Sequence, residues 1–309
     1  MIISASRRTD IPAFYSDWFF RRLEEGYVYV RNPMNFRRIY SVSLTRDVVD
    51  GIVFWTKNPK AMLPRLDLLD AFPYYFQFTL TPYDKSIEPN LEKTEVIETF
   101  KRLSDEIGKD RVIWRYDPLI VTLEFDERYH YSQFERLASE LCSFTNKCVI
   151  SFIDFYPKTK KQLNKIQANE IDDAKKQTIL RELSNIATAF NLKLETCAEA
   201  IDLSGLGIDP SRCVNADLVS KISGIKLDTK KDRNQRKACR CHTSIDIGAY
   251  NTCPHGCIYC YATFSRKACM KNIKLYDISS PLLCGVLTDE DILTERKISS
   301  FAIGGYTVG

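Results

Sequence analysis

Two hydrophobic patterns alternate along the first two hundred residues. Short runs rich in β-branched and aromatic residues predict strands at 1–6, 51–56, 74–80, 111–117, 148–154 and 192–197. Amphipathic stretches of helical length lie between these runs, at 16–25, 95–108, 131–144 and 178–191. This alternation is typical of βα units arranged around a parallel sheet. We therefore expect an α/β fold.

Polar residues follow four of the predicted strands directly, in the sequences SRRTD, TKNP, TPYD and RYDP. In α/β barrels the loops at the carboxyl ends of the strands build the active site. The recurrence predicts a polar pocket at one rim, although each cluster alone is equally well explained as a solvated loop with salt bridges. The candidate catalytic residues are Arg7, Arg8, Asp10, Lys57, Arg115 and Asp117.

Proline and tryptophan add local detail. The Asn-Pro steps at 32–33 and 58–59 and the Asp-Pro step at 117–118 predict loops, because the residue before proline avoids the helical region. Trp55 and Trp114 end strands beside polar clusters, so they belong to the core or line the pocket.

The alternation of predicted strands and helices ends at Cys197. A glycine-containing loop is followed by the basic run KLDTKKDRNQRKACRC and by a final apparent strand at 244–250. We expect a β/α barrel body over residues 1–196 and a cysteine-rich segment over 197–309 that completes the barrel. The basic run is most simply a solvated face or linker.

Composition narrows the function classes. The chain has 309 residues, 44% hydrophobic residues and a net charge of +4, which is too small for a dedicated nucleic-acid binder. Neither a membrane-spanning apolar stretch nor a signal-peptide core is evident, so a cytoplasmic location without a membrane partner is expected. The eleven cysteines would stay reduced there, which favours metal ligation or thiol chemistry over disulfides.

Three of these cysteines stand in the stretch YNTCPHGCIYCYAT. Cys253, Cys257 and Cys260 have the spacing CxxxCxxC, and thiolates are suitable ligands for iron–sulfur clusters. Three ligands for a four-iron cubane leave one iron free to bind a small molecule, in the way that a catalytic zinc site keeps an open position.

This spacing, with the aromatic Tyr259 before the third cysteine, resembles the radical S-adenosylmethionine superfamily. The resemblance implies a [4Fe-4S] cluster whose open iron chelates S-adenosylmethionine, with Tyr259 near the adenine. It also implies one-electron cleavage of the sulfonium, a 5′-deoxyadenosyl radical that abstracts hydrogen from the substrate, and an electron donor such as flavodoxin or ferredoxin. The protein's part is to position the substrate and exclude water.

The motif stands close to the C-terminus, whereas usual members of the superfamily carry it after the first strand of a partial βα barrel. We therefore expect a circularly permuted, TIM-like partial barrel in which 244–250 is the usual first strand and 1–6 its neighbour. The SRRTD loop would then replace the family's glycine-rich acidic loop, which is absent. On placement alone, Arg8, Thr9 and Asp10 are cofactor-binding candidates.

A longer resemblance covers nearly the whole chain. The segments SASRRTDIPAFYSDWF, VFWTKNP, FQFTLTPY, WRYDP and CRC…DIGAYNTCPHGCIYCYA are similar to the bacterial domain of unknown function 1848. The ending CIYCYA is also similar to that of spore photoproduct lyase and its relatives, but this likeness covers only the cysteine loop. The substrate is expected to be a small or nucleotide-like polar molecule, with nucleic acid not favoured.

Cys197, Cys213, Cys239 and Cys241 form a second set. Our preferred interpretation is a fully ligated auxiliary iron–sulfur cluster; structural zinc and coincidental buried thiols are the alternatives. The four remaining cysteines are expected to be inert packing.

A zinc-stabilised nucleic-acid-binding or repair-associated module is the competing interpretation of the whole segment. In that case His242 or His255 could supply nitrogen ligands, and the basic run would contact nucleic acid. Otherwise His255 is expected to be solvated or to lie behind the ligands, and His130 to be a surface residue at a helix start.

Overall fold

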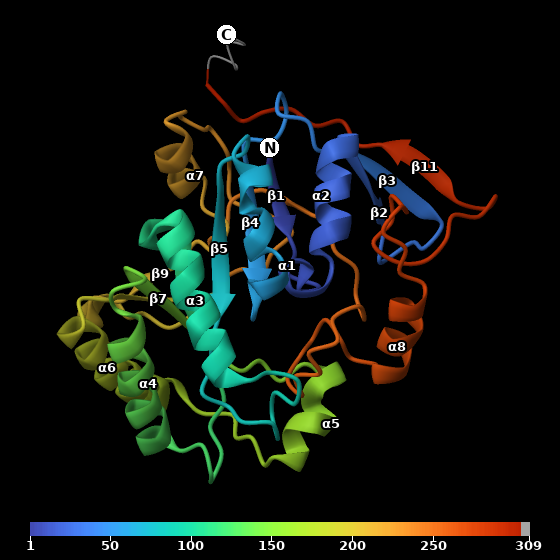
Figure 1. The fold of residues 1–309 in the computed structure, drawn as a ribbon. Coiled ribbons are helices and arrows are strands. Elements are labelled where there is room, and N and C mark those ends of the chain that lie inside the picture. Colours follow the sequence, from blue (N-terminus) through green and yellow to red (C-terminus); the bar gives the residue numbers. More distant parts are fainter. Residues whose placement is uncertain (304–309) are drawn as a thin grey trace.

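A parallel sheet of eight strands forms the centre of the computed structural model, which describes residues 1–303 (Figure 1). Its order is β10-β1-β4-β5-β6-β7-β8-β9. The strands are β1 (Ile2–Ala5), β4 (Gly51–Thr56), β5 (Tyr74–Thr79), β6 (Val112–Leu119), β7 (Lys147–Phe152), β8 (Lys193–Thr196), β9 (Asp209–Pro210) and β10 (Ile245–Asp246). The six strands predicted from the first two hundred residues are confirmed, and they lie side by side in chain order. The α/β class is thereby confirmed.

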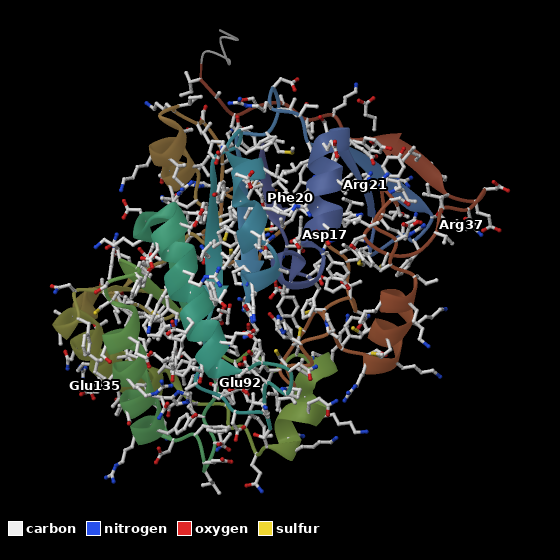
Figure 2. All side chains as sticks on the ribbon, viewed as in Figure 1. Asp17, Phe20, Arg21, Arg37, Glu92 and Glu135 are labelled. Atoms are coloured by element: carbon white, nitrogen blue, oxygen red, sulfur yellow. The ribbon has the colours of Figure 1, made fainter. Side chains whose placement is uncertain are left out.

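Helices connect and cover these strands. They are α1 (Ile11–Phe14), α2 (Ser16–Glu25), α3 (Lys93–Ile107), α4 (Glu127–Leu141), α5 (Pro157–Lys165), α6 (Asp173–Ala189), α7 (Ala216–Ser223) and α8 (Arg266–Lys274). Short 3-10 turns are η1 (Pro59–Ala61), η2 (Leu63–Leu69), η3 (Lys109–Arg111) and η4 (Ser204–Leu206). The four predicted helices are α2, α3, α4 and α6. Their amphipathic pattern sets their orientation: on α2, Phe20 faces the sheet and Arg21 faces outward (Figure 2).

The two faces of the sheet are buried by different parts of the chain. One face carries Phe54, Phe76 and Trp114, which pack against side chains of α2, α3 and α4. The opposite face carries Val53 and Tyr75, which pack against the segment that contains Cys213 and Val219. Parallel strands are buried on both sides, which explains their nearly continuous apolar sequences. The cysteine-rich segment is thus part of the core.

This segment also joins the sheet at both edges. Strand β10 pairs in parallel with β1, with Ile3 opposite Ile245, and β9 pairs in parallel with β8. The expected contact between 244–250 and the first strand is confirmed, although the strand is only Ile245–Asp246. Strands β10 and β9 form the two ends of the sheet order.

A second sheet was not predicted. Strands β2 (Tyr27–Arg31) and β3 (Arg38–Ser43) form an antiparallel hairpin, and β11 (Ile292–Glu295) adds in parallel to β3. Its three strands alternate between buried and exposed positions only weakly, and β11 is exposed throughout. The hydrophobic pattern that identifies a strand is therefore weak here.

The loop predicted at Asp117–Pro118 is wrong, because both residues lie within β6. The pairing of β6 with β7 shifts register between Tyr116 and Leu119, and such an irregularity accommodates a proline that cannot donate a ladder hydrogen bond. Within residues 1–303, no helix is both long enough and apolar enough to cross a membrane. The last part of the tail, 304–309, lies outside the described residues.

Candidate functional site

A cavity of about 380 Å³ lies at the carboxyl ends of β1, β4 and β6. In Figure 1 the arrowheads of β4 and β5 point toward this end of the sheet, where α5 and α8 lie. Every residue predicted for the site lines this one cavity: Arg7, Arg8, Thr9, Asp10, Lys57, Arg115, Asp117, Cys197, Cys213, Cys239, Cys241, Cys253, Cys257, Tyr259 and Cys260. The predicted polar rim and both cysteine sets therefore meet, although they are far apart in the sequence.

The CxxxCxxC loop is closed by local hydrogen bonds. The Asn251 side-chain oxygen accepts from the backbone N–H groups of Phe264 and Ser265, each at 3.0 Å, and the Asn251 N–H donates to the Ala262 carbonyl at 2.8 Å. Gly256 has φ +77°, a conformation that glycine adopts without strain. These contacts bring the two ends of the loop together, so that its three cysteines lie within one compact turn.

Asp10 connects the loop to two strands. Its carboxylate accepts the Lys57 backbone N–H at 2.7 Å, caps α1 by accepting the Ala13 N–H at 3.0 Å, and contacts His255 Nε2 at 2.8 Å. Protein groups therefore occupy both carboxylate oxygens. Asp10 therefore joins the β1, β4 and cysteine loops.

A fully buried carboxylate lies behind Tyr259. Glu88 accepts from Lys57 at 2.7 Å, from Thr81 at 2.9 Å, and from Lys93 and the Tyr259 hydroxyl. Burial favours the protonated form of Glu88, but the adjacent Lys57 and Lys93 outweigh it and lower its pKa to about 2. Lys57 also lies over the Tyr259 ring, 5.4 Å from its centroid. This network holds the aromatic residue of the motif against the body of the protein.

Asp246, at the end of β10, ties that strand to the first loop. It accepts from Ser4 at 3.1 Å, from Ser6 at 2.5 Å and from the Arg7 N–H at 2.8 Å. The backbone approaches closely here, since a Cβ on Gly248 would lie 2.1 Å from the Ser6 hydroxyl. The SRRTD loop is consequently held directly beside the strand that leads into the cysteine loop.

The second cysteine set is assembled from three separate segments. The Sγ atoms of Cys213 and Cys197 are 3.4 Å apart, and the Sγ of Cys241 accepts the Val214 N–H at 3.4 Å. The Cys241 N–H donates to the Sγ of Cys239 at 3.5 Å. The hydrogen bond with Cys241 lowers the pKa of Cys239 to about 7. The four thiols are therefore close neighbours in the fold.

Two arginines lie between this set and the rest of the cavity. Arg115 donates to the Cys213 Sγ at 2.8 Å and pairs with Asp117, which also accepts from Ser151. The guanidinium carbons of Arg7 and Arg115 each lie 5.2 Å from the Trp55 ring centroid. Trp55 thus lines the cavity, whereas Trp114 is fully buried in the core. The cations place positive charge beside groups that are anionic when they bind metal.

Several buried polar atoms of cavity-lining residues are unpaired. Arg7 Nη2, Thr9 Oγ1 and His255 Nδ1 have no hydrogen-bond partner among the described residues. Such groups are costly to bury unless a ligand or water satisfies them. These unpaired atoms could contact a polar ligand in the cavity.

The thiols themselves are not arranged as an ion site in this conformation. Across residues 1–303, no group of three or more histidine, cysteine, aspartate or glutamate side chains is placed to hold a metal ion. Burial raises the pKa of Cys257 to about 12 and that of Cys253 well above its usual value. Metal binding there would displace protons from the thiols.

The histidines depart from some expectations. His130 is fully buried rather than on the surface, and its ring contacts the Tyr116 hydroxyl and the Ile120 carbonyl, each at 2.9 Å. His255 was expected to be solvated or to lie behind the ligands; it is buried against Asp10, so the solvated alternative is wrong. His242 Nδ1 accepts the Ala216 N–H at 2.9 Å and does not line the cavity.

Glu88 and Asp246 were not predicted from the sequence as site residues. Glu88 stands in no recognisable motif, whereas Asp246 opens the DIGAY segment, and both acquire their partners through contacts between distant segments. The only available signal was that Asp246 lies in the final apparent strand, immediately before the cysteine loop.

A family model described as "Domain of unknown function (DUF1848)" matches residues 2–262, which include both cysteine sets. The comparisons with curated proteins and with solved structures find no significant match.

Proposed function

Because the chain belongs to the DUF1848 family, whose description states no reaction, we propose a function from the site: a radical S-adenosylmethionine enzyme. One observation carries the proposal. The CxxxCxxC cysteines follow β10 at the edge of a parallel sheet and face the same cavity as the polar loops after β1, β4 and β6. In this proposal the sheet is a partial βα barrel, circularly permuted so that β10 is its first strand.

Cys253, Cys257 and Cys260 would hold a [4Fe-4S] cluster with one open iron. When bound, the cluster and S-adenosylmethionine supply one-electron cleavage of the sulfonium and begin radical chemistry on the substrate. Thr9 and Arg7 have unpaired atoms beside the cysteine loop and are candidates to bind polar groups of the cofactor. Tyr259, held by Glu88, would form part of the wall beside the adenine.

The substrate would bind between the two cysteine sets. The Trp55 ring offers an apolar surface there, and Arg7 and Arg115 offer positive charge. A small or nucleotide-like polar molecule with an anionic group suits this combination. Enclosure by the cysteine loop and the basic run, whose Arg236 pairs with Asp154 at the cavity, would exclude water from the reaction.

Cys197, Cys213, Cys239 and Cys241 would hold a fully ligated auxiliary cluster, with zinc as the alternative metal. The close approach of Arg115 to Cys213 supports an anionic group at this position. We place the enzyme in the cytoplasm, where its eleven cysteines would remain reduced.

The zinc-binding nucleic-acid module has weaker support. Its proposed nitrogen ligands already contact protein groups, with His255 bonded to Asp10 and His242 to the Ala216 N–H. Part of the basic run is also folded onto the protein through Arg236 and Asp154. Measuring the metal content of the purified protein distinguishes this alternative from the iron–sulfur enzyme.

The decisive experiment is anaerobic reconstitution followed by iron, sulfide and zinc analysis. The wild type is compared with a Cys253→Ala, Cys257→Ala, Cys260→Ala variant and with a Cys142→Ala, Cys284→Ala control, whose cysteines do not line the cavity. We expect a brown wild type that cleaves S-adenosylmethionine with dithionite, and a loop variant that loses about four irons and all cleavage. A colourless wild type with stoichiometric zinc and no iron would refute the proposal.

A second experiment tests the first loop. The Arg7→Gln, Arg8→Gln double variant should weaken S-adenosylmethionine binding or turnover, because Arg7 reaches the cavity with an unpaired nitrogen. Unchanged affinity and turnover would remove the β1 loop from the site.

A further inference from the structure

We propose that helices α5 and α8 form the docking face for a small acidic protein that delivers single electrons. This inference rests on the proposed function and names the surface and the partner class. The surface surrounds a second hollow of about 510 Å³, which we call the outer groove. Among its lining residues are Lys158, Lys165, Phe264, Arg266 and Met270.

The outer groove lies on the other side of the cysteine loop from the cavity. Cys253, Cys257 and Cys260 line both hollows, so the loop is the partition between them. Pro254 and Gly256 of the same loop complete the floor of the groove. A protein seated in the groove would therefore approach the three ligands without entering the substrate cavity, and a short distance is what electron transfer between proteins requires.

The two helices beside the groove carry only positive charge. Neither α5 nor α8 contains an aspartate or glutamate. Their cations are all exposed, and none forms a salt bridge with another described residue: Lys158, Lys160, Lys161, Lys165, Arg266, Lys267, Lys271 and Lys274. These eight charges exceed the net charge of +4 of the whole chain, so the remainder is net negative. The two helices therefore place a dense group of positive charges beside the outer groove.

Elsewhere the exposed cations of the helices are often paired. On α2, Arg21 bonds to Glu25 at 3.0 Å, and on α4, Arg136 bonds to Glu140 at 3.1 Å. Unpaired like charges repel each other on a short helix and contribute nothing to its stability. Their accumulation on α5 and α8 is therefore explained better by an acidic partner than by folding.

An apolar centre lies inside this basic rim. Phe264 is 41% exposed and Met270 is 52% exposed, and both line the outer groove. Lys158 Nζ lies 4.1 Å from the Phe264 ring centroid, so the rim and the centre are in contact. A small apolar patch with a charged rim suits a transient encounter, in which electrostatics sets the association rate and contact is brief.

The position of the groove favours an electron carrier over nucleic acid. The proposed chemistry requires one electron per cleavage from outside the protein, and the groove is where the cluster ligands approach that surface. In the transfer, the reduced flavin or iron–sulfur group of the partner loses one electron and the cluster gains it. No bond is made or broken and no proton is needed.

The test compares two reductants in S-adenosylmethionine cleavage. One is dithionite, which needs no docking face, and the other is an acidic flavodoxin reduced by its reductase. The groove variant is Lys158→Glu, Lys165→Glu, Arg266→Glu. Its control is Arg46→Glu, Lys109→Glu, Arg181→Glu, which reverses three exposed cations that form no salt bridge with another described residue and line neither hollow. Helix α6, which carries Arg181, lies away from α5 and α8 in Figure 1.

We expect the flavodoxin-driven rate of the groove variant at low salt to be at least about tenfold lower than that of the wild type. Its dithionite-driven rate should be unchanged. The control should retain both rates, and added salt should slow only the flavodoxin reaction of the wild type. Equal flavodoxin-driven rates in the groove variant and the control would overturn the docking face.

A second variant tests the same face without changing residues next to the cysteine loop, so that loss of the cluster cannot explain the result. Lys160→Glu, Lys161→Glu, Lys271→Glu reverses charges on the same helices but outside the lining of the groove. It should lower the flavodoxin-driven rate in the same direction with full dithionite activity, and retention of both rates would again overturn the proposal.

Direct binding separates this inference from the proposed function. If the wild type fails to cleave S-adenosylmethionine with dithionite, the enzyme assignment fails, but salt-sensitive binding of flavodoxin to the wild type and not to the groove variant would still support the docking face. If the groove variant instead loses affinity for a DNA duplex or RNA hairpin and keeps its affinity for flavodoxin, the face belongs to nucleic acid.

Discussion

The two cysteine sets face one cavity but are built in opposite ways. Cys253, Cys257 and Cys260 lie within eight residues, in a loop that Asn251 closes by local hydrogen bonds. Cys197 and Cys213 belong to segments on either side of β9, and the Cys239–Cys241 pair comes from a third segment. The first arrangement is a property of a short sequence, and the second is a property of the whole fold.

This difference has an energetic consequence. The loop depends on contacts behind it, chiefly the buried Glu88 network and the aromatic stack in which Tyr259 lies edge-on to Tyr83 and Tyr83 edge-on to His130. The second set depends on the sheet, since Tyr75 and Gln77 of β5 hold the Cys213 carbonyl at 2.7 and 2.9 Å. Substitutions at the two sets should therefore have different effects on S-adenosylmethionine cleavage and on iron content.

The largest effect is expected from the loop. A Cys260→Ala variant should lose S-adenosylmethionine cleavage completely and about four of about eight irons, because three ligands are the minimum for the open cluster. Iron analysis and product chromatography after reconstitution measure both. Retained cleavage would show that the reaction does not depend on this loop.

A substitution in the second set should remove iron without removing the cleavage activity of the first set. Cys213→Ala should also remove about four irons. Reductive cleavage of S-adenosylmethionine without substrate should stay within about twofold of the wild type, because the two sets come from separate segments of the chain. Loss of iron from both sets at once would contradict this expectation and would mean that the two sets form one cooperative unit.

A smaller effect, on stability, is expected behind the loop. Glu88→Gln leaves Lys57 and Lys93 beside a neutral amide, and breaking a buried ion pair costs about 3–5 kcal/mol. Urea unfolding at pH 7 measures the change in the free energy of unfolding. The matched control is Glu95→Gln, which removes an exposed pair with Lys60 and should cost below about 1 kcal/mol. Equal losses would show that Glu88 is not a support of the loop.

The smallest effect is a dependence of stability on pH through His130. Burial lowers its pKa from 6.5 to about 4, so between these values the unfolded chain binds a proton that the native protein does not. The free energy of unfolding should fall as the pH falls through this range, by up to about 3 kcal/mol from this residue.

Urea unfolding of the wild type and of His130→Gln at several pH values between 4 and 7 isolates this contribution. The variant should show a flatter dependence over the same range, whatever its stability at pH 7. Parallel curves for the two proteins would exclude His130 as the source.

Much of the fold and part of the site were predictable from the sequence. Six strands and four helices follow from hydrophobic periodicity, because each element buries one stripe or face of its own residues. The CxxxCxxC loop was recognisable because its three cysteines and its glycine are neighbours in the chain. The polar residues after the strands were predictable as a group, since parallel strands end at one edge of the sheet.

Only the tertiary structure decided which side chains contact each other across the cavity. Asp246 binds Ser6 across 240 residues, Tyr259 binds Glu88 across 171, and Arg115 binds the Cys213 thiol across 98. Nothing in the local pattern distinguishes Glu88 from a surface glutamate or His130 from a helix-start histidine, because burial depends on which segments the topology brings against them. The sequence by itself determined six strands, four helices and the cysteine loop, because each depends on neighbouring residues. The assembly of the cavity from both ends of the chain was decided only by the sheet order that pairs β10 with β1.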